Sequence, residues 1–387
     1  MLIKLLYFLL AIVIFFYHKN KKIAYSTPAC IVTFSIFVGL FFAEVGGLFF
    51  DFLEVSNIFY IISFIVCLIF FAPMFFCKKN IGAKREYKKS IFQNNIKLIY
   101  IFLFIVLTVH FARCMSFGSV GSELFEYNYS RHLGAHFLNL LIVAIAYTIC
   151  FMPVRKNIIF IVIGLFFVFL SGTKYHLIFI FATCFIIFMH RKPRFRKIFK
   201  IVFFIFFTIL SVFIINYFVG FKLRGISTDN FLEFVIVHFL KYVGGATIAF
   251  GEIIENDLIK IDFFNSYISS TFTEFIGISS SVDEITNVYT SFGSFLFEYG
   301  YLKTLMIFII GSCLFNFLYF YRLKTSSSLL AYSFFVGTPL LMTFFSSFWV
   351  LTNIFEWGFL ALIFEPFFLS ENSIFQIVFK YRSNLRL

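Results

Sequence analysis

The fold follows first from residues 56–77, which read SNIFYIISFIVCLIFFAPMFFC. This stretch contains no Asp, Glu, Lys or Arg, and an apolar run of about 20 residues is the length that an α-helix needs to cross a bilayer. Similar uncharged runs occupy residues 132–152, 201–221 and 328–348. We therefore expect each of these runs to form a helix that crosses a membrane.

The composition extends this expectation to the whole chain. Of its 387 residues, 61% are hydrophobic and 13% are charged. The sequence predicts an all-α polytopic membrane protein with about 11 (10–12) transmembrane helices and one large outer loop. The predicted spans are 2–17, 28–43, 56–77, 97–112, 133–152, 157–171, 174–190, 199–220, 299–320, 328–348 and 351–369.

The spans divide the chain into three predicted parts. Residues 1–220 form an N-terminal bundle of transmembrane helices, residues 221–298 form the large outer loop, and residues 299–387 add the C-terminal transmembrane helices. Within the loop, residues 231–254 read FLEFVIVHFLKYVGGATIAFGEII. Because charged residues interrupt this apolar stretch, it predicts an interfacial or re-entrant helix more than a span.

The positive charge of the chain predicts its orientation. With the amino terminus outside, 23 of the 32 Lys and Arg residues fall on the cytoplasmic side. The positive-inside rule favours this orientation, and it also explains the net charge of +13 without nucleic acid as a partner. The cytoplasmic connections are 18–27, 78–97, 153–156, 191–200, 321–327 and 380–387.

Several classes of chemistry lack their motifs in this chain. The seven cysteines show no CxxC pair and no ligand-like spacing, so we expect neither a disulfide framework nor a metal site. The sequence has no GxxxxGK phosphate loop, no HExxH pair and no GxSxG elbow. We therefore expect no cofactor.

One lysine lies in a long apolar stretch. In LSGTKYHLI (170–178), Lys174 is the only Lys, Arg, Asp or Glu between Asn157 and His190. A cation inside a span costs about 2.5–3.5 kcal/mol on insertion scales. A break at residues 171–173 would place Lys174 in an outer turn between two short spans, where it either binds a substrate, extends to lipid headgroups or pairs with a helix end.

Four further cations on the outer side are candidates for binding phosphate. Arg grips a phosphate or pyrophosphate with two parallel hydrogen bonds and Lys binds it as a point charge. Each has a simpler alternative: salt bridges for two arginines that bracket an outer loop, a helix anchor for the third, and a pair with Glu233 or His238 for the lysine. These candidates are Arg113, Arg131, Arg224 and Lys241.

Glu298, Glu123 and His176 are the candidates for proton transfer. Glu298 precedes a predicted span and has Lys303 as an alternative partner about one helical turn on. His176 lies two residues after Lys174, although a lone His is more often a packing residue. Glu356 lies inside the last predicted span and could balance one of the outer cations.

Two stretches resemble a known family. LSGTKYHLI (170–178) resembles the Leu-Ser-Gly-Ser-Arg stretch of O-antigen polymerases of the Wzy type, the oligosaccharide repeat unit polymerases. TNVYTSFGSFLFEYGYLKTLMIFIIG (286–311) is similar to their stretch in which Asn-Val-Tyr-Thr leads to an acid, an aromatic residue and Gly. Lys174 stands where the family more often has Arg, and Glu298 where Asp is commoner.

The resemblance implies a reaction at the periplasmic face of the bacterial inner membrane. An oligosaccharide would be transferred from undecaprenyl diphosphate to a hydroxyl of the next lipid-linked repeat unit. The resemblance implies inner membrane lipids and a chain-length regulator protein as partners. Lys174, Arg224, Arg113, Arg131 and Lys241 would bind the lipid pyrophosphate, and the catalytic candidates are those named above.

Two other functions stay open. An O-antigen ligase would use the same lipid-linked donor and would show the same outer cations. A repeat-unit flippase would be expected to place charges inside several spans and to have short loops. The charge-poor span interiors and the large outer loop favour surface chemistry over transport.

Overall fold

The computed structural model is mostly helical in the residues that it describes. Helices occur at ten of the eleven predicted spans. The remaining predicted span, 199–220, lies outside the described residues apart from positions 210, 211 and 214. The structure describes residues 2–50, 54–76, 93–120, 122–130, 132–171, 174–191, 210–211, 214, 231–255, 259–261, 266–268, 276–279, 282–286, 291–343 and 352–369.

The helices at the predicted spans follow the chain in order. They are α1 (Leu2–Asn20), α2 (Pro28–Phe49), α3 (Asn57–Phe71) with η1 (Ala72–Phe75), α4 (Gln93–Met115), α6 (His132–Phe151), α7 (Val154–Phe169) and α8 (Lys174–His190). After the large loop come α11 (Ser291–Phe317) with η2 (Leu318–Arg322), α12 (Ser326–Tyr332) with η3 (Ser333–Gly337) and α13 (Thr338–Leu341), and α14 (Thr352–Phe364) with η5 (Glu365–Leu369).

Six of the described helices are long and apolar enough to cross a membrane, and two shorter apolar helices accompany them. The chain is therefore a helical membrane protein, while the total of about 11 spans stays a prediction. The six are Ile3–Asn20, Pro28–Phe49, Asn57–Phe75, Asn95–Met115, Gly134–Phe151 and Tyr299–Arg322; the shorter two are Tyr175–His190 and Ser326–Leu341.

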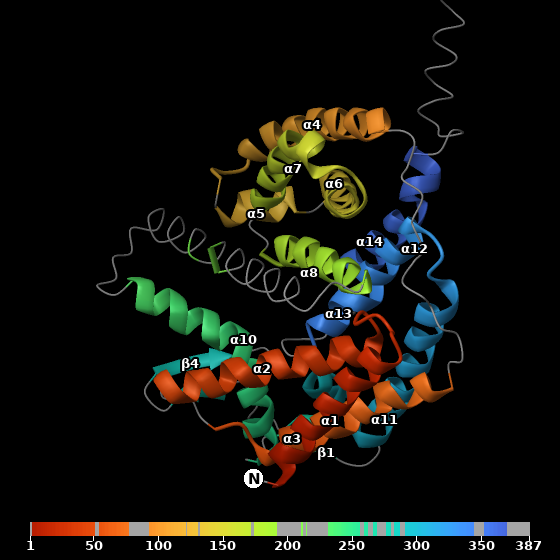
Figure 1. Cartoon of the computed structure of the whole chain (residues 1–387). Coiled ribbons are helices and arrows are strands. Elements are labelled where there is room, and N and C mark those ends of the chain that lie inside the picture. The colour runs from red at the N-terminus through yellow and green to blue at the C-terminus, as the bar shows by residue number, and fades with distance from the viewer. Residues whose placement is uncertain are drawn as a thin grey trace, which may run out of the picture.

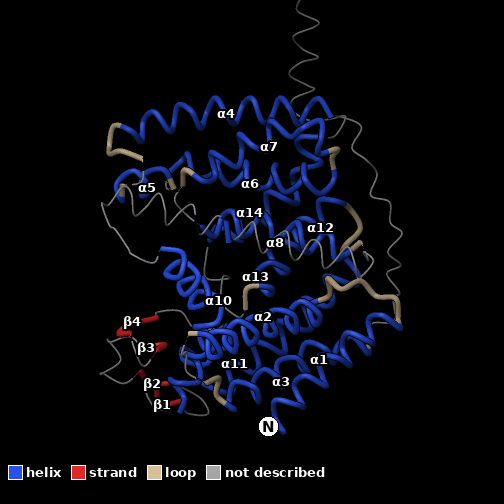
Figure 2. The backbone as a smooth tube through the Cα atoms, turned by 60° about the vertical axis from the view of Figure 1, so that its left-hand side comes forward, coloured by secondary structure: helices blue, strands red, loops and turns tan. Residues whose placement is uncertain are grey.

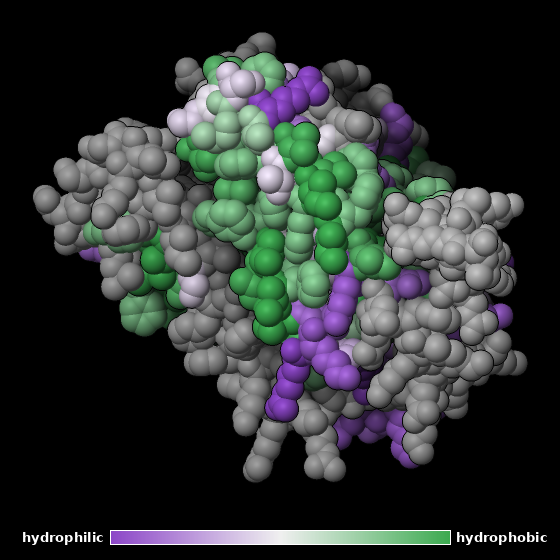
Figure 3. Space-filling model, turned by 90° about the horizontal axis from the view of Figure 1, so that it is seen from above, coloured by the Kyte–Doolittle hydropathy of each residue, from purple (hydrophilic) through white to green (hydrophobic). Residues whose placement is uncertain are grey.

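The surface of the bundle is apolar where lipid would cover it. Figure 3 shows a broad hydrophobic band with hydrophilic side chains at its margins. Large exposed side chains on two neighbouring helices include Val109 of α4, which is 67% exposed, and Ile159 of α7, which is 69% exposed. A soluble monomer rarely exposes so wide an apolar surface, so this band fits the hydrocarbon core of a bilayer.

The helices form three layers. Figures 1 and 2 show α4, α6 and α7 on one side, α1, α2, α3 and α11 on the other, and α8, α13 and α14 between them. The short helix α5 (Glu123–Tyr129) and the four strands lie at one end of the helices (Figure 2). This is the end at which the charge pattern predicts the outer segments.

Four helix ends meet at the opposite end of the bundle. Ser26, in the α1–α2 turn, hydrogen-bonds through its Oγ to His190 Nδ1 at 3.0 Å and to Tyr319 OH at 3.2 Å. Tyr332 OH donates to the Ser26 carbonyl oxygen at 3.0 Å. These contacts join the α1–α2 turn to the end of α8, to η2 after α11 and to the last residue of α12. The charge pattern predicts the turn and the ends of α8 and η2 on one side of the membrane.

The described residues of the large loop form one long helix and two short hairpins before α11 begins. Helix α10 (Phe231–Glu255) crosses α2 so closely that a Cβ atom built on Gly244 would lie 2.6 Å from the Ala43 nitrogen (Figure 1). The Phe250 ring packs 5.7 Å from that of Phe59. The carboxyl half of α10 is therefore buried against the N-terminal helices. The strands, which the sequence did not predict, are β1 (Ile259–Ile261) paired with β2 (Ser266–Ile268) and β3 (Ile276–Ser279) paired with β4 (Val282–Thr286).

The crossing of α10 and α2 predicts the effect of a methyl group at Gly244. Gly244→Ala places the new Cβ against the α2 backbone, which cannot rotate away, so we expect a loss of about 1–3 kcal/mol of stability. Thermal unfolding of the detergent-solubilised protein measures it. Gly311→Ala is the matched control, because its Cβ would meet only Phe315 at 3.7 Å. Equal melting temperatures for the two variants would contradict the close crossing.

Candidate functional site

The amino ends of α6, α8 and α14 come together in the structure. Asn353 Nδ2, in the first turn of α14, donates to Tyr175 OH, in the first turn of α8, at 3.2 Å. The rings of Tyr175 and His176 lie 6.3 Å and 5.7 Å from the Trp357 ring. The three helices run in the same direction, as expected for predicted spans that all begin on the outer side.

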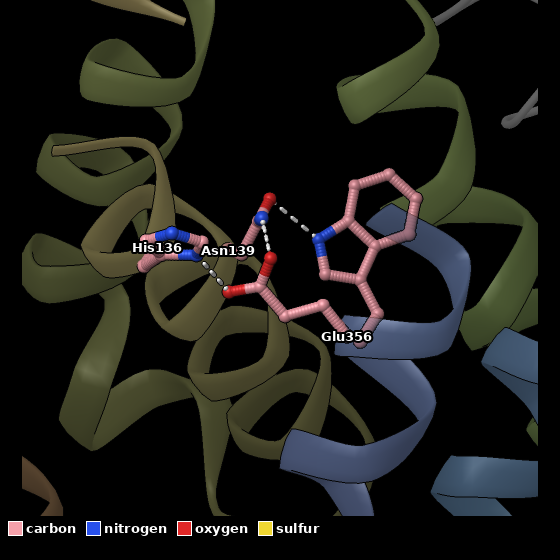
Figure 4. Close-up of polar contacts among 4 residues, drawn as sticks. His136, Asn139 and Glu356 are labelled. Atoms are coloured by element: carbon pink, nitrogen blue, oxygen red, sulfur yellow. Dashed lines mark hydrogen bonds and ion pairs between the residues drawn. The ribbon is translucent and has the colours of Figure 1, made fainter. Parts of the chain in front are cut away.

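A chain of hydrogen bonds links α14 to α6 at this level (Figure 4). The Trp357 indole N–H donates to Asn139 Oδ1 at 2.8 Å, and Asn139 Nδ2 donates to Glu356 Oε2 at 2.7 Å. The other carboxylate oxygen, Oε1, lies 2.8 Å from His136 Nδ1. An indole can only donate, so Trp357 fixes the orientation of the Asn139 amide. The amide must then present its N–H group to the carboxylate.

The sequence builds this chain from two short segments. His136 and Asn139 are three residues apart and share one face of α6, while Glu356 and Trp357 are neighbours on α14. Trp357 is fully buried, and its ring packs 5.0 Å from that of Phe179. The side chain of Glu356 is 25% exposed and that of His136 is 66% exposed. The chain therefore runs from the bundle interior to its surface.

The LSGTKYHLI segment lies beside this chain. Ser171 Oγ donates to the Val168 carbonyl at 2.7 Å and lies 3.0 Å from His176 Nδ1. His176 is 2% exposed, and its Nε2 is buried without a hydrogen-bond partner among the described residues. Burial against Trp357 closes His176 to a substrate hydroxyl in this arrangement. Its contacts are those of a residue that fixes the turn between α7 and α8.

Helix α5 links the end of α4, which carries the predicted cation Arg113, to the end of α7. Tyr129 OH donates to the Phe167 carbonyl at 3.3 Å, and the Tyr129 carbonyl lies 3.2 Å from His110 Nε2. Burial raises the pKa of the Tyr129 phenol, so it stays a neutral donor. Arg113 is exposed in the last turn of α4, one turn beyond His110. Arg113 and the α7–α8 turn are thus held at one level.

The structure describes the other predicted site residues only in part. Lys174 is the first residue of α8, Glu123 the first of α5, Lys241 lies within α10 and Glu298 within α11, each with its backbone described but not its side chain. Arg131 and Arg224 lie outside the described residues. Whether these six side chains share a site with Glu356 therefore stays a prediction.

Gly300 explains the glycine of the second quoted motif. It has φ 76° and ψ 179°, a conformation essentially restricted to glycine, and it breaks α11 inside Glu298-Tyr299-Gly300. Glu298 therefore precedes the break, and the apolar span Tyr299–Arg322 follows it. The main neighbours of α11 are α3 and strands β1 and β2. The Glu298 segment thus packs in a different layer from Lys174.

Sequence reasoning missed the pairing of Glu356 with His136. The sequence singles out Glu356 as a possible counter-ion to the outer cations and does not single out His136. The available signal was the acid itself, because an ionisable residue inside a predicted span needs a partner. The identity of that partner, 220 residues away, follows only from the contact between α6 and α14.

The break at Gly300 predicts strain in an alanine variant. Gly300→Ala puts a Cβ atom on a backbone conformation that L-residues avoid, at a cost of about 1–3 kcal/mol. We expect a lower melting temperature in detergent than for the wild type. Gly311→Ala, in the same helix but without a positive φ, is expected to unfold at or above the wild-type temperature. A Gly300→Ala protein as stable as Gly311→Ala would show that the break is not needed.

The comparisons with known proteins found no relative of this chain. No family model, no curated protein and no solved structure matches the chain. The site and the two motifs at 170–178 and 286–311 are therefore what indicates a function.

Proposed function

We propose that this protein is an O-antigen polymerase that extends lipid-linked oligosaccharides at the periplasmic face of the inner membrane. One observation carries the proposal. The LSGTKYHLI segment packs directly on α14 beside the Glu356 chain of hydrogen bonds, through Tyr175 and His176. A motif that resembles the polymerases thus adjoins acid–base groups at the end of the bundle where the outer cations are predicted.

The proposed reaction needs neither a nucleotide nor a metal, because its donor is already activated. The oxygen of the acceptor hydroxyl attacks the anomeric carbon at the reducing end of the donor glycan. A new C–O bond forms there while the bond from that carbon to the pyrophosphate oxygen breaks. The lipid pyrophosphate leaves with the electron pair, and the hydroxyl proton passes to a base on the protein.

The leaving pyrophosphate gains negative charge, which fixed positive groups stabilise. Lys174 begins α8, so its backbone position belongs to this level of the bundle, and the first-turn backbone N–H groups of a helix can add to the binding of an anion. Arg113 is exposed at the same level on α4. Lys174 and Arg113, with Arg131, Arg224 and Lys241, are the proposed pyrophosphate-binding residues.

Two features support the membrane setting of the proposal. The apolar band of Figure 3 suits a protein whose donor and acceptor both carry a polyprenyl chain. The charge-poor helices leave the polar chain at Glu356 near one end of the bundle instead of at its centre. A reaction at the membrane surface fits this distribution better than transport through the bundle does.

Deletion of the gene tests the proposal at the level of the cell. Loss of a polymerase leaves lipid A core that carries a single repeat unit, because transfer of one unit to the core is still possible. We expect this single-unit band on a gel of surface polysaccharide. A complete absence of repeat units on the core would overturn the proposal and would favour a ligase or a flippase.

Substitution of Lys174 tests the proposed phosphate clamp. Lys174→Ala should abolish chain extension in the complemented strain while the protein still inserts in the membrane at normal levels. Lys174→Arg should retain ladders, since Arg keeps the charge and adds a second donor to phosphate. Lys156→Ala is the control, because Lys156 is exposed in the first turn of α7 on the predicted cytoplasmic side. Normal ladders from Lys174→Ala would remove this residue from the site.

A further inference from the structure

We infer that His136 is the general base for the acceptor hydroxyl and that Glu356 is its positioning residue. The inference rests on the proposed function and names a group that the sequence did not single out. His136 of α6 and Glu356 of α14 point toward each other (Figure 4), and α14 also contacts the LSGTKYHLI segment through Asn353 and Tyr175. Three properties of the His136 imidazole favour this role: its protonation, its exposure and the hydrogen bonds that hold its partner Glu356.

The protonation follows from the contact with Glu356. An ionised carboxylate only accepts hydrogen bonds, so the His136 Nδ1 atom, 2.8 Å from Glu356 Oε1, must carry the proton. In the neutral imidazole, Nε2 then holds a free lone pair. None of the described residues forms a hydrogen bond with this second nitrogen. Nε2 is therefore the atom that can accept a proton.

The exposure of the chain favours a role at the surface. Trp357 is fully buried and Asn139 is 2% exposed, whereas the His136 side chain is 66% exposed. The buried Asn139 thus fixes the Glu356 carboxylate from the bundle interior, and the His136 imidazole is the end of the chain that contacts solvent. A base oriented by a second group that is itself oriented by a third is the usual arrangement for proton transfer in group-transfer enzymes.

A purely structural role explains this arrangement less well. Even a fully charged pair with one largely exposed partner contributes only about 0–1 kcal/mol to stability. The helices α6 and α14 are already joined by the buried Trp357–Asn139 hydrogen bond. One buried donor, Asn139, which Trp357 in turn orients, therefore fixes a carboxylate whose other partner is an exposed imidazole. A network of buried polar groups that orients one exposed side chain is typical of a site that holds this side chain in a set position.

The position of the pair relative to the motif fits the reaction. Asn353, one turn before Glu356, donates to Tyr175, the neighbour of Lys174. The backbone position of the proposed pyrophosphate ligand and the proposed base therefore belong to adjacent turns of packed helices. In the transfer step, His136 Nε2 takes the proton of the acceptor hydroxyl as its oxygen bonds to the anomeric carbon. The imidazolium that forms is stabilised by the Glu356 carboxylate.

Purified protein with lipid-diphosphate-linked repeat units as both donor and acceptor tests the inference. We expect His136→Ala and His136→Gln to lower turnover by about 100-fold or more, the usual size of general-base catalysis. Gln can still donate to Glu356 but cannot take up a proton, so it separates the base from the contact. Added imidazole should restore part of the turnover of His136→Ala and none of that of His136→Gln. Glu356→Gln should lower turnover while binding of the donor lipid stays unchanged.

Glu44→Gln is the matched control. Glu44 pairs with Lys4 at 3.2 Å on two other helices, α1 and α2, and its loss should leave turnover unchanged. Turnover by His136→Gln within a few-fold of wild type would overturn the inference, as would a loss in His136→Ala that imidazole does not reverse. Absence of polymerisation by the wild-type protein would instead overturn the proposed function itself.

Discussion

The bilayer makes an unpaired polar group inside the bundle costly, and this constraint organises the structure. Unpaired polar groups in hydrocarbon cost several kcal/mol, so the helices satisfy their own backbones and the few polar side chains gather in clusters. Three such clusters join distant segments: Ser26 with His190 and two tyrosines, Lys4 with Glu44, and Glu356 with His136. Each cluster lies near a helix end, where water and headgroups lower the cost of charge.

The same constraint explains how much of the fold the sequence predicts. Because a span must be apolar over about 20 residues, uncharged runs such as 56–77 and 132–152 locate their helices to within a few residues. The packing of α10 against α2 could not be read in this way. It depends on the fit of Gly244 to the Ala43 backbone, and neither residue marks its partner in the sequence. The two hairpins in the large loop were also missed, since their strands are only three to five residues long.

The candidate site shows the same division between local and distant information. Lys174 was found because one cation in an apolar run stands out, and the structure places it at the start of α8 as the predicted break requires. Gly300, by contrast, forms a break in α11 that the sequence did not predict. Glu356 stands out equally in its span, but the residue that it serves lies on α6. Sequence analysis therefore predicted where polar groups are unusual and could not predict which of them meet.

The direction of the Glu356 chain distinguishes it from the Ser26 cluster. In the Ser26 cluster the hydroxyl and imidazole groups bond to one another and are all buried, so it can only hold helix ends together. In the Glu356 chain the donors Trp357 and Asn139 lie in the interior. The Glu356 carboxylate, which accepts from Asn139, contacts the exposed imidazole of His136. Polar groups that only stabilise a bundle are expected to hydrogen-bond to one another. Groups that act on a substrate must include at least one side chain that is exposed at the surface. By this physical criterion, together with its contact with the LSGTKYHLI segment, the end of α6 and α14 is where chemistry is to be sought.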